Sequence, residues 1–204
     1  MTDTKASKQK THQKKMQTLK ENIDASIESA SLEQGVFILL TGNGKGKTSS
    51  AFGMVMRALG YGHKVAVVQF IKGEQLSGEE LYLRDQCPQV KFNQMGTGFT
   101  WDTQDRSADI AAAEKSWAVA EQVLADEQYD LVVLDELTYM LSFKYLEKER
   151  VLTALKNRPY EQSLVVTGRG GGAELIELAD TVSEVKEIKH AYNEGVMARK
   201  GVDF

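Results

Sequence analysis

The sequence has little cysteine, little proline and no long apolar run. Its single cysteine, Cys87, excludes an internal disulfide and a zinc site built from cysteines. No apolar stretch approaches the roughly 20 residues that span a membrane, and the polar first residues do not resemble a signal peptide. A net charge of −4 over 204 residues disfavours a general nucleic-acid binder. We therefore expect a cytoplasmic protein with one core that takes up most of the chain.

Charge is distributed unevenly along the chain. Residues 1–20 contain six lysines and one aspartate, a net charge of +5, so the remainder carries −9. Four apolar residues recur at helical spacing, Met16, Leu19, Ile23 and Ile27. Two interpretations of residues 1–34 stay open. They form either a frayed, solvated tail that leads into a helix, or a basic arm that folds over an active site or a neighbouring subunit.

From residue 35 onward, short apolar runs alternate with helical stretches. The expected strands are 36–40, 64–70, 90–94, 130–135, 162–167 and 181–188. The expected helices are 46–59, 79–86, 107–126, 146–156 and 173–179. Strands that are apolar throughout are buried on both faces, and strands that alternate with helices need crossover connections. The pattern predicts an α/β fold, with a mostly parallel sheet flanked by helices, in one domain over residues 35–204.

The segment TGNGKGKT, residues 41–48, links the first expected strand to a helix. Its glycines let backbone N–H groups turn toward an anion, and the helix N-terminus favours negative charge. In such a loop Lys47 contacts phosphate oxygens and the Thr48 hydroxyl binds Mg²⁺. Thr41 stands where the usual pattern has glycine, so the loop is a variant. We expect a P-loop NTPase-like nucleotide site rather than a glycine-rich turn without a ligand.

An acidic pair, Asp135 and Glu136, follows the fourth expected strand. Parallel strands deliver their last residues to the sheet edge where ligands bind in α/β proteins. One carboxylate is expected to serve Mg²⁺, while the other supports it or contacts substrate. The alternative is that Asp135 caps the helix that follows.

Two aromatic residues, Phe99 and Trp101, lie in a segment rich in glycine and threonine after the third expected strand. Large rings two residues apart in a loop indicate a platform for a flat ligand. The alternative is a hydrophobic anchor that pins the loop to the core.

Seven stretches together resemble the P-loop family of ATP:corrinoid adenosyltransferases. They are TGNGKGKT (41–48), FGMVMRALGYG (52–62), VAVVQFIKG (65–73), TGFTWDTQDR (97–106), VVLDELTYM (132–140), TGRG (167–170) and ADTVSEVKEIKHAYNEGVMARKGVDF (179–204). The resemblance covers roughly residues 35–204 and is far more specific than the phosphate loop alone. It implies transfer of the 5′-deoxyadenosyl group of ATP to the cobalt(I) of a corrinoid such as cobalamin, with release of triphosphate, in cobalamin biosynthesis and salvage.

The resemblance also implies roles for individual residues. ATP lies reversed in the loop relative to ordinary P-loop ATPases, with its phosphates on the loop residues Gly42, Asn43, Gly44, Lys45, Gly46, Lys47 and Thr48. Mg²⁺ (or Mn²⁺) is bound by Thr48 and Glu136, with Asp135 supporting them, and Lys47 and Glu136 act in catalysis.

For the corrinoid, the resemblance implies that Phe99 and Trp101 pack against the ring and displace the lower axial ligand of cobalt. Loss of that ligand eases reduction to cobalt(I). Further contacts are expected from Arg57 and Arg169 to ATP, and from Met95, Arg106 and His190 to the corrinoid. Either ATP-side arginine has the alternative of a surface salt bridge, and His190 that of pairing with the C-terminal segment.

A chain of this length leaves no room for a separate corrinoid domain. The corrinoid pocket is therefore expected from connections above the sheet, the C-terminal segment and a neighbouring subunit, with the basic arm as a mobile lid. The family resemblance implies a homodimer and a reduced flavoprotein as electron donor, with no nucleic-acid or membrane partner. Two alternatives stay open: a small P-loop ATPase or nucleoside kinase with Glu136 as base, and a nucleotide-gated binding module that uses the arm.

Overall fold

Helix α1 (Thr2–Ser29) belongs to the first of two units into which the chain divides, Met1–Glu33 and Gln34–Phe204. The computed structural model describes residues 2–71, 77–95 and 105–204. The apolar stripe from Met16 to Ile27 is exposed on α1. Helix α1 begins at Thr2, and both interpretations of residues 1–34 stay open. Across the described residues, no helix is both long and apolar enough to cross a membrane.

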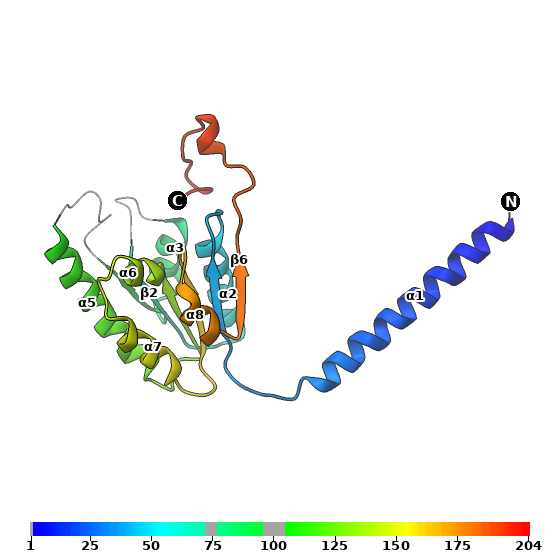
Figure 1. Ribbon diagram of the computed structural model, residues 1–204, viewed down its shortest axis with the longest axis horizontal. Coiled ribbons are helices and arrows are strands. Elements are labelled where there is room, and N and C mark those ends of the chain that lie inside the picture. The colour runs from blue at the N-terminus through cyan, green and yellow to red at the C-terminus, as the bar shows by residue number, and fades with distance from the viewer. Residues whose placement is uncertain (1, 72–76, 96–104) are drawn as a thin grey trace. The chain divides into compact units, whose positions relative to one another are not determined.

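The second unit is built on a six-stranded sheet in the order β3-β2-β4-β5-β1-β6, with every neighbouring pair parallel (Figure 1). Its strands are β1 (Phe37–Thr41), β2 (Val65–Gln69), β3 (Lys91–Gln94), β4 (Leu131–Asp135), β5 (Ser163–Thr167) and β6 (Thr181–Glu184). All six begin within one residue of their expected starts. The predicted α/β fold of the P-loop NTPase type is confirmed.

Helices cover both faces of this sheet. They are α2 (Lys47–Gly60), α3 (Gly78–Gln86), α5 (Arg106–Leu124), α6 (Leu137–Ser142), α7 (Lys148–Lys156) and α8 (Gly172–Leu178). The last four pack on one face through a core centred on Trp117, while α2 and α3 pack on the other face through Phe52 and Leu83. In β4, Val132 and Leu134 face the first core and Leu131 and Val133 the second, which explains why the strand is apolar throughout.

Several details differ from the expectations, and α5 ends at Leu124 rather than at residue 126. The short helix α6 was not expected, α7 begins at Lys148 rather than at residue 146, and β6 ends at Glu184 rather than at 188. Directly after β6, Val185 N donates to the carbonyl of Thr41 in β1 (2.8 Å), and the Val185 carbonyl accepts a hydrogen bond from Gly44 N (2.7 Å) in the phosphate loop. The remaining residues form a segment, 185–204, with a single 3₁₀ turn, η1 (Ala191–Glu194).

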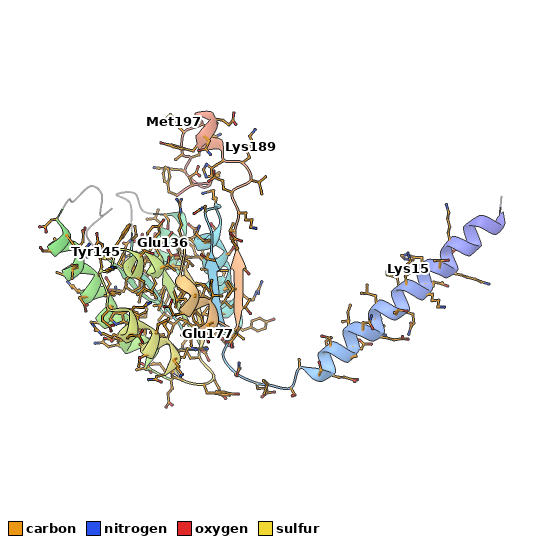
Figure 2. The ribbon with its side chains drawn as sticks, viewed as in Figure 1. Lys15, Glu136, Tyr145, Glu177, Lys189 and Met197 are labelled. Carbon is orange, nitrogen blue, oxygen red and sulfur yellow. The ribbon has the colours of Figure 1, made fainter. Side chains whose placement is uncertain are left out.

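The parallel arrangement brings the last residues of the strands to one edge of the sheet. Gln69, the last residue of β2, is in register with Asp135 of β4 on one side and with Gln94 of β3 on the other. Figure 2 shows Glu136 at this edge, below the segment that carries Lys189 and Met197, and Glu177 toward the opposite end. The edge where Glu136 lies is the one that carries the phosphate loop.

Candidate active site

The phosphate loop turns from β1 into α2 with its lysine held inward. Gly46 has a φ of 117°, a left-handed conformation that favours glycine, and α2 begins at Lys47. The Lys47 side chain is 7% exposed, and its Nζ donates a hydrogen bond to the carbonyl of Gly44 (2.9 Å). Burial lowers the pKa of Lys47, while the nearby Glu136 carboxylate opposes that shift. The ammonium group is therefore buried in the loop that the sequence assigns to phosphate.

Residues 185–186 cross directly over the phosphate loop. A Cβ on Gly44 would lie 2.8 Å from the Lys186 carbonyl oxygen, and one on Gly42 would collide with the Val185 carbonyl. Glycine at both positions thus permits the close approach of the chain that follows β6. On the other side of the loop, the Thr41 hydroxyl donates a hydrogen bond to the Gly170 carbonyl. The residue that departs from the usual loop pattern therefore ties the loop to the connection after β5.

Asp135 is held by three side-chain donors at the end of β4. Its Oδ1 accepts hydrogen bonds from the hydroxyls of Thr48 (3.0 Å) and Thr167 (2.6 Å), and its Oδ2 accepts one from Gln69 Nε2 (2.9 Å). Asp135 is 1% exposed, and burial raises its pKa while the three hydrogen bonds oppose that rise. The structure therefore brings Thr48 and Asp135 together, and it engages both carboxylate oxygens of Asp135.

Glu136 sits beside Asp135 in a strained backbone conformation. Its φ of 60° is in the left-handed region, and its N–H donates to the Thr167 hydroxyl (2.9 Å). Burial and the neighbouring Asp135 raise the pKa of Glu136 to about 7, against the opposing charges of Lys47 and Arg169. Its Oε2 is buried, with no hydrogen-bond donor among the described residues. This oxygen is available to a cation.

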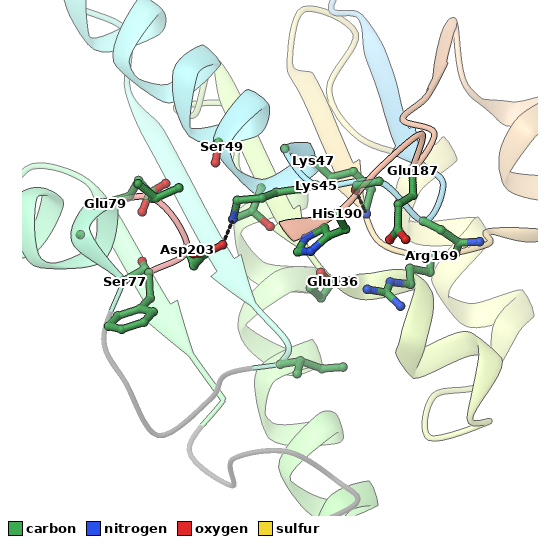
Figure 3. Close-up of a pocket in the computed structure, with 18 of the residues that line it drawn as sticks. Lys45, Lys47, Ser49, Ser77, Glu79, Glu136, Arg169, Glu187, His190 and Asp203 are labelled. Carbon is green, nitrogen blue, oxygen red and sulfur yellow. Dashed lines mark hydrogen bonds and ion pairs between the residues drawn. The ribbon is translucent and has the colours of Figure 1, made fainter. Parts of the chain in front are cut away.

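A cavity of about 690 Å³ lies over these groups. Figure 3 shows Lys45, Glu136, Arg169 and His190 among the side chains that surround it. Its lining comes from the phosphate loop and the start of α2 (43–49), Ile71, the start of α3 (77–79), Glu136, Tyr139, Arg169, Glu187, His190 and residues 201–204. The volume lies in the range of small-molecule sites. Three cationic side chains and the loop N–H groups suit a polyanion, and the buried carboxylate suits a cation between it and that polyanion.

The C-terminal segment supplies part of this wall. The sequence predicted that this segment would contribute to the corrinoid pocket, but His190 was the one residue of it predicted by number. Glu187, Asp203 and Phe204 line the cavity, and Lys45 Nζ lies 3.0 Å from Asp203 Oδ1. No local pattern in residues 185–204 signals this, because the contacts join positions far apart in the chain. The expectation that the C-terminal segment helps to form a pocket came from the chain length and from the match of residues 179–204 to the resembled family.

The residues expected to contact ATP or the corrinoid outside the phosphate loop do not all lie at the cavity. Arg169 and His190 line the cavity, and His190 Nδ1 also accepts a hydrogen bond from Tyr192 N (3.2 Å). Arg57 is exposed in the last turn of α2, away from the cavity lining. The structure therefore brings two of these three residues to the cavity, and a contact of Arg57 with ATP stays a prediction.

Of the residues expected on the corrinoid side that the structure describes, His190 lines this cavity, whereas Met95 and Arg106 do not. Met95 is 2% exposed and packs in the core, and its N–H donates to the Gln69 carbonyl (2.9 Å). Arg106 begins α5, with its guanidinium 5.2 Å from the centre of the Tyr145 ring. Phe99 and Trp101 lie outside the described residues. The corrinoid contacts of all four residues stay predictions.

The donors at the cavity fit a hard divalent cation shared with phosphates. In the described parts of the chain, no cluster of three or more His, Cys, Asp or Glu side chains would hold a metal by itself. Mg²⁺ is commonly bound by one or two carboxylates plus substrate phosphates, so such a cluster is not required. The free Oε2 of Glu136 and the hydroxyl of Thr48 are the oxygen ligands that this cation prefers.

Comparisons with known proteins agree with the geometry. A family model described as ATP:corrinoid adenosyltransferase BtuR/CobO/CobP matches residues 33–204. A corrinoid adenosyltransferase of Pseudomonas aeruginosa is 52% identical over 97% of both chains. The corrinoid adenosyltransferase of Escherichia coli K12 is 49% identical, and corrinoid adenosyltransferase CobA of Salmonella typhimurium 48%, each over 95% of this chain and 97% of the relative. The chain belongs to the ATP:corrinoid adenosyltransferase family, and it is an enzyme of the transferase class.

Proposed function

We propose that this enzyme transfers the 5′-deoxyadenosyl group of ATP to the cobalt(I) of a corrinoid, with the nucleotide bound in the cavity over the phosphate loop. The observation that carries the proposal is that Lys47 and Glu136 meet at this cavity, in a chain of the adenosyltransferase family. The names of the relatives describe adenosyl transfer to corrinoids. The proposal assigns the same pair of substrates, ATP and a corrinoid, to this chain.

The transfer is a displacement at C5′ of ATP. Cobalt(I) supplies both electrons of the new cobalt–carbon bond, the C5′–O bond breaks, and triphosphate leaves with the electron pair of that bond. Cobalt(I) is an exceptional nucleophile, so the protein does not have to supply a general base. Its task is to hold the triphosphate firmly and to leave C5′ exposed to the corrinoid.

The phosphate loop performs the first part of this task. The N–H groups of residues 42–48 and the ammonium of Lys47 surround the triphosphate, and Arg169 adds a second positive charge from the connection after β5. Negative charge on the leaving oxygen grows as the C5′–O bond breaks, so a fixed cation in a buried loop stabilises the transition state more than the bound substrate. The reversed orientation of ATP follows from the family resemblance.

Mg²⁺ is the proposed cation of the site, held by Thr48 and Glu136. When bound, it would offset part of the triphosphate charge. Asp135 holds the Thr48 hydroxyl through Oδ1 and is itself fixed by Thr167 and Gln69. In this scheme Asp135 supports the ligands of the cation.

Several finer expectations belong to the same proposal. Phe99 and Trp101 form the platform under the corrin ring, and a reduced flavoprotein supplies the electrons that make cobalt(I). The enzyme works in the cytoplasm as a homodimer, and the basic residues 1–34 act as a mobile lid. Each of these rests on the sequence and the family resemblance.

The direct test is anaerobic incubation of the protein with ATP, Mg²⁺ and chemically reduced cobalamin, followed by absorbance. We expect a light-sensitive cobalt–carbon product together with triphosphate. Phosphate or ADP as the main product would instead support a small ATPase or nucleoside kinase.

Deleting residues 1–20 separates the lid from the second alternative, a nucleotide-gated binding module. A lid predicts slower corrinoid turnover after the deletion. Nucleic-acid binding that falls steeply with salt and disappears with the deletion would favour the module.

A further inference from the structure

A row of side-chain hydrogen bonds runs across the carboxyl ends of β4, β2 and β3. Gln69 Nε2 donates to Asp135 Oδ2 (2.9 Å), and Gln94 Nε2 donates to Gln69 Oε1 (3.2 Å). These three residues are in register on adjacent parallel strands, so their side chains stand on the same face of the sheet. The row is therefore a direct product of the strand alignment.

The row continues onto helix α3 through a buried acid. Gln94 Nε2 also donates to Glu80 Oε2 (3.1 Å), and Arg84 Nε donates to Glu80 Oε1 (2.9 Å). Glu80 is 1% exposed, whereas Arg84 is half exposed with its guanidinium over the ring of Phe92. A carboxylate buried to this degree needs charged or hydrogen-bonding partners, so the α3 end of the row is firmly fixed.

The ends of the row determine which way each amide points. A carboxylate only accepts, so Asp135 requires the NH₂ group of Gln69, which turns the Gln69 carbonyl toward Gln94. Glu80 likewise takes the NH₂ group of Gln94, and Arg84 Nη2 donates to the Gln94 carbonyl (3.4 Å). Interchanging nitrogen and oxygen in either glutamine would set donor against donor or acceptor against acceptor. The row thus has one orientation that satisfies all of its members.

We propose that Gln69 and Gln94 are positioning residues of the adenosyl transfer, which act through Asp135 on the Thr48 hydroxyl. Gln69 holds Oδ2 of Asp135, which leaves Oδ1 directed at Thr48 and Thr167. Gln94 acts one step further away, because it fixes the amide of Gln69. The effect of the two glutamines on the reaction rests on the proposed function. Their effect on nucleotide binding can be measured without turnover.

The test compares Gln69→Met and Gln94→Met, alone and together. Gln162→Met serves as the control, because Gln162 is also a buried glutamine (2% exposed) and lies at the opposite end of the sheet, where its Nε2 donates to two backbone carbonyls. For each variant we would measure the dissociation constant of Mg²⁺–ATP by calorimetry, kcat and KM with chemically reduced cobalamin, and the midpoint of thermal unfolding.

We expect Gln69→Met to weaken Mg²⁺–ATP binding and to lower kcat/KM for ATP by about tenfold, because it leaves a buried carboxylate oxygen without its donor. KM for the corrinoid should change little. Gln94→Met should have a smaller effect, and the double variant should be no worse than Gln69→Met, since both act along one path. Gln162→Met should lower the unfolding midpoint without changing ATP binding.

Two outcomes would overturn the proposal. One is Gln69→Met behaving like Gln162→Met, with reduced stability and unchanged ATP binding. The other is multiplicative losses in the double variant, which would show independent roles. Failure of the wild type to form a cobalt–carbon bond would refute the proposed reaction instead, and the calorimetry would still decide whether the glutamines position the nucleotide site.

Discussion

Lys45 Nζ lies 3.0 Å from Asp203 Oδ1, so an ion pair joins the phosphate loop to the next-to-last residue of the chain. Asp203 is also fixed locally, because its other carboxylate oxygen accepts from Arg199 N (2.9 Å). That backbone hydrogen bond, and then Lys45, lower the pKa of Asp203 and keep it ionised. A carboxylate therefore stands next to a lysine of the loop that is proposed to bind triphosphate.

Replacing this carboxylate with an amide should strengthen ATP binding. In Asp203→Asn the negative charge beside the phosphate loop is gone, so its repulsion of the triphosphate disappears and Lys45 is free to turn to the ligand. We expect the dissociation constant of ATP to fall about threefold, in line with the modest strength of charges near a protein surface. The unfolding midpoint should barely move, because partly exposed ion pairs contribute little to stability.

The matched control is Asp203→Glu, which keeps the charge and should keep the affinity of the wild type. Weaker ATP binding by Asp203→Asn would contradict this prediction. It would mean that the ion pair of Asp203 with Lys45 stabilises the ATP-bound state by holding the C-terminal segment over the nucleotide.

Lys47 should matter far more than its neighbour in the loop. Lys47→Ala removes the buried cation proposed to stabilise the leaving triphosphate, so ATP binding and turnover should fall together, with kcat/KM lower by about a hundredfold. Lys45→Ala is the control, because Lys45 is much more exposed than Lys47 (42% of its side chain) and is already paired with Asp203, so its effect should be much smaller. Steady-state kinetics with chemically reduced cobalamin would measure both. Near-normal catalysis by Lys47→Ala would refute its assigned role.

The fold was predictable because its central strands are short apolar runs covered on both sides. Strands β2 and β4 are buried at every residue and β1 and β5 at most residues, and this burial is why their sequences are apolar runs. Helix α6 was not predicted, because it has only six residues, which are too few to show a helical period, and because it begins soon after strand β4. Edge strand β6 was predicted too long, because residues 185–188 keep a strand-like composition while Val185 bonds to the phosphate loop.

The candidate site was predictable only where local patterns report it. The approach of Thr48 to Asp135 follows from a loop and a strand end that each carry a recognisable motif. The ion pair of Lys45 with Asp203, and the glutamine row at Gln69, follow no local pattern, since each depends on how distant segments meet in three dimensions. Arg57 lies in a stretch that matches the family but is exposed in the last turn of α2, so its contact with ATP stays a prediction.

Glu136 should make the stability of the nucleotide-free protein depend on pH. Its pKa is raised from 4.5 to about 7 in the folded state. Between pH 4.5 and pH 7, Glu136 therefore keeps its proton in the folded protein but has lost it in the unfolded protein. The contribution of Glu136 to the free energy of unfolding is therefore full below pH 4.5 and is lost as pH rises through 7. The loss is about 3 kcal/mol.

Glu136→Gln removes this titration. The difference in free energy of unfolding between the variant and the wild type should therefore shift in favour of the variant as pH rises from 4.5 to 7, and should stay constant above pH 7. Urea unfolding at pH 5 and pH 8, without nucleotide, would measure the difference. Parallel curves for the two proteins would contradict the raised pKa.

Trp101 should affect the cobalt chemistry without affecting the nucleotide. The residue lies outside the described parts of the chain, so this prediction rests on its place in the stretch TGFTWDTQDR and on the resemblance to the family. If Trp101 helps to displace the lower axial ligand, Trp101→Ala should cripple adenosylation that starts from cobalt(II) and a reduced flavoprotein. Turnover with cobalamin already reduced to cobalt(I) should be much less affected, because the step that needs ligand loss has been bypassed. Calorimetry should find ATP affinity close to that of the wild type, and a collapse of ATP binding would show that the aromatic platform is wrongly assigned.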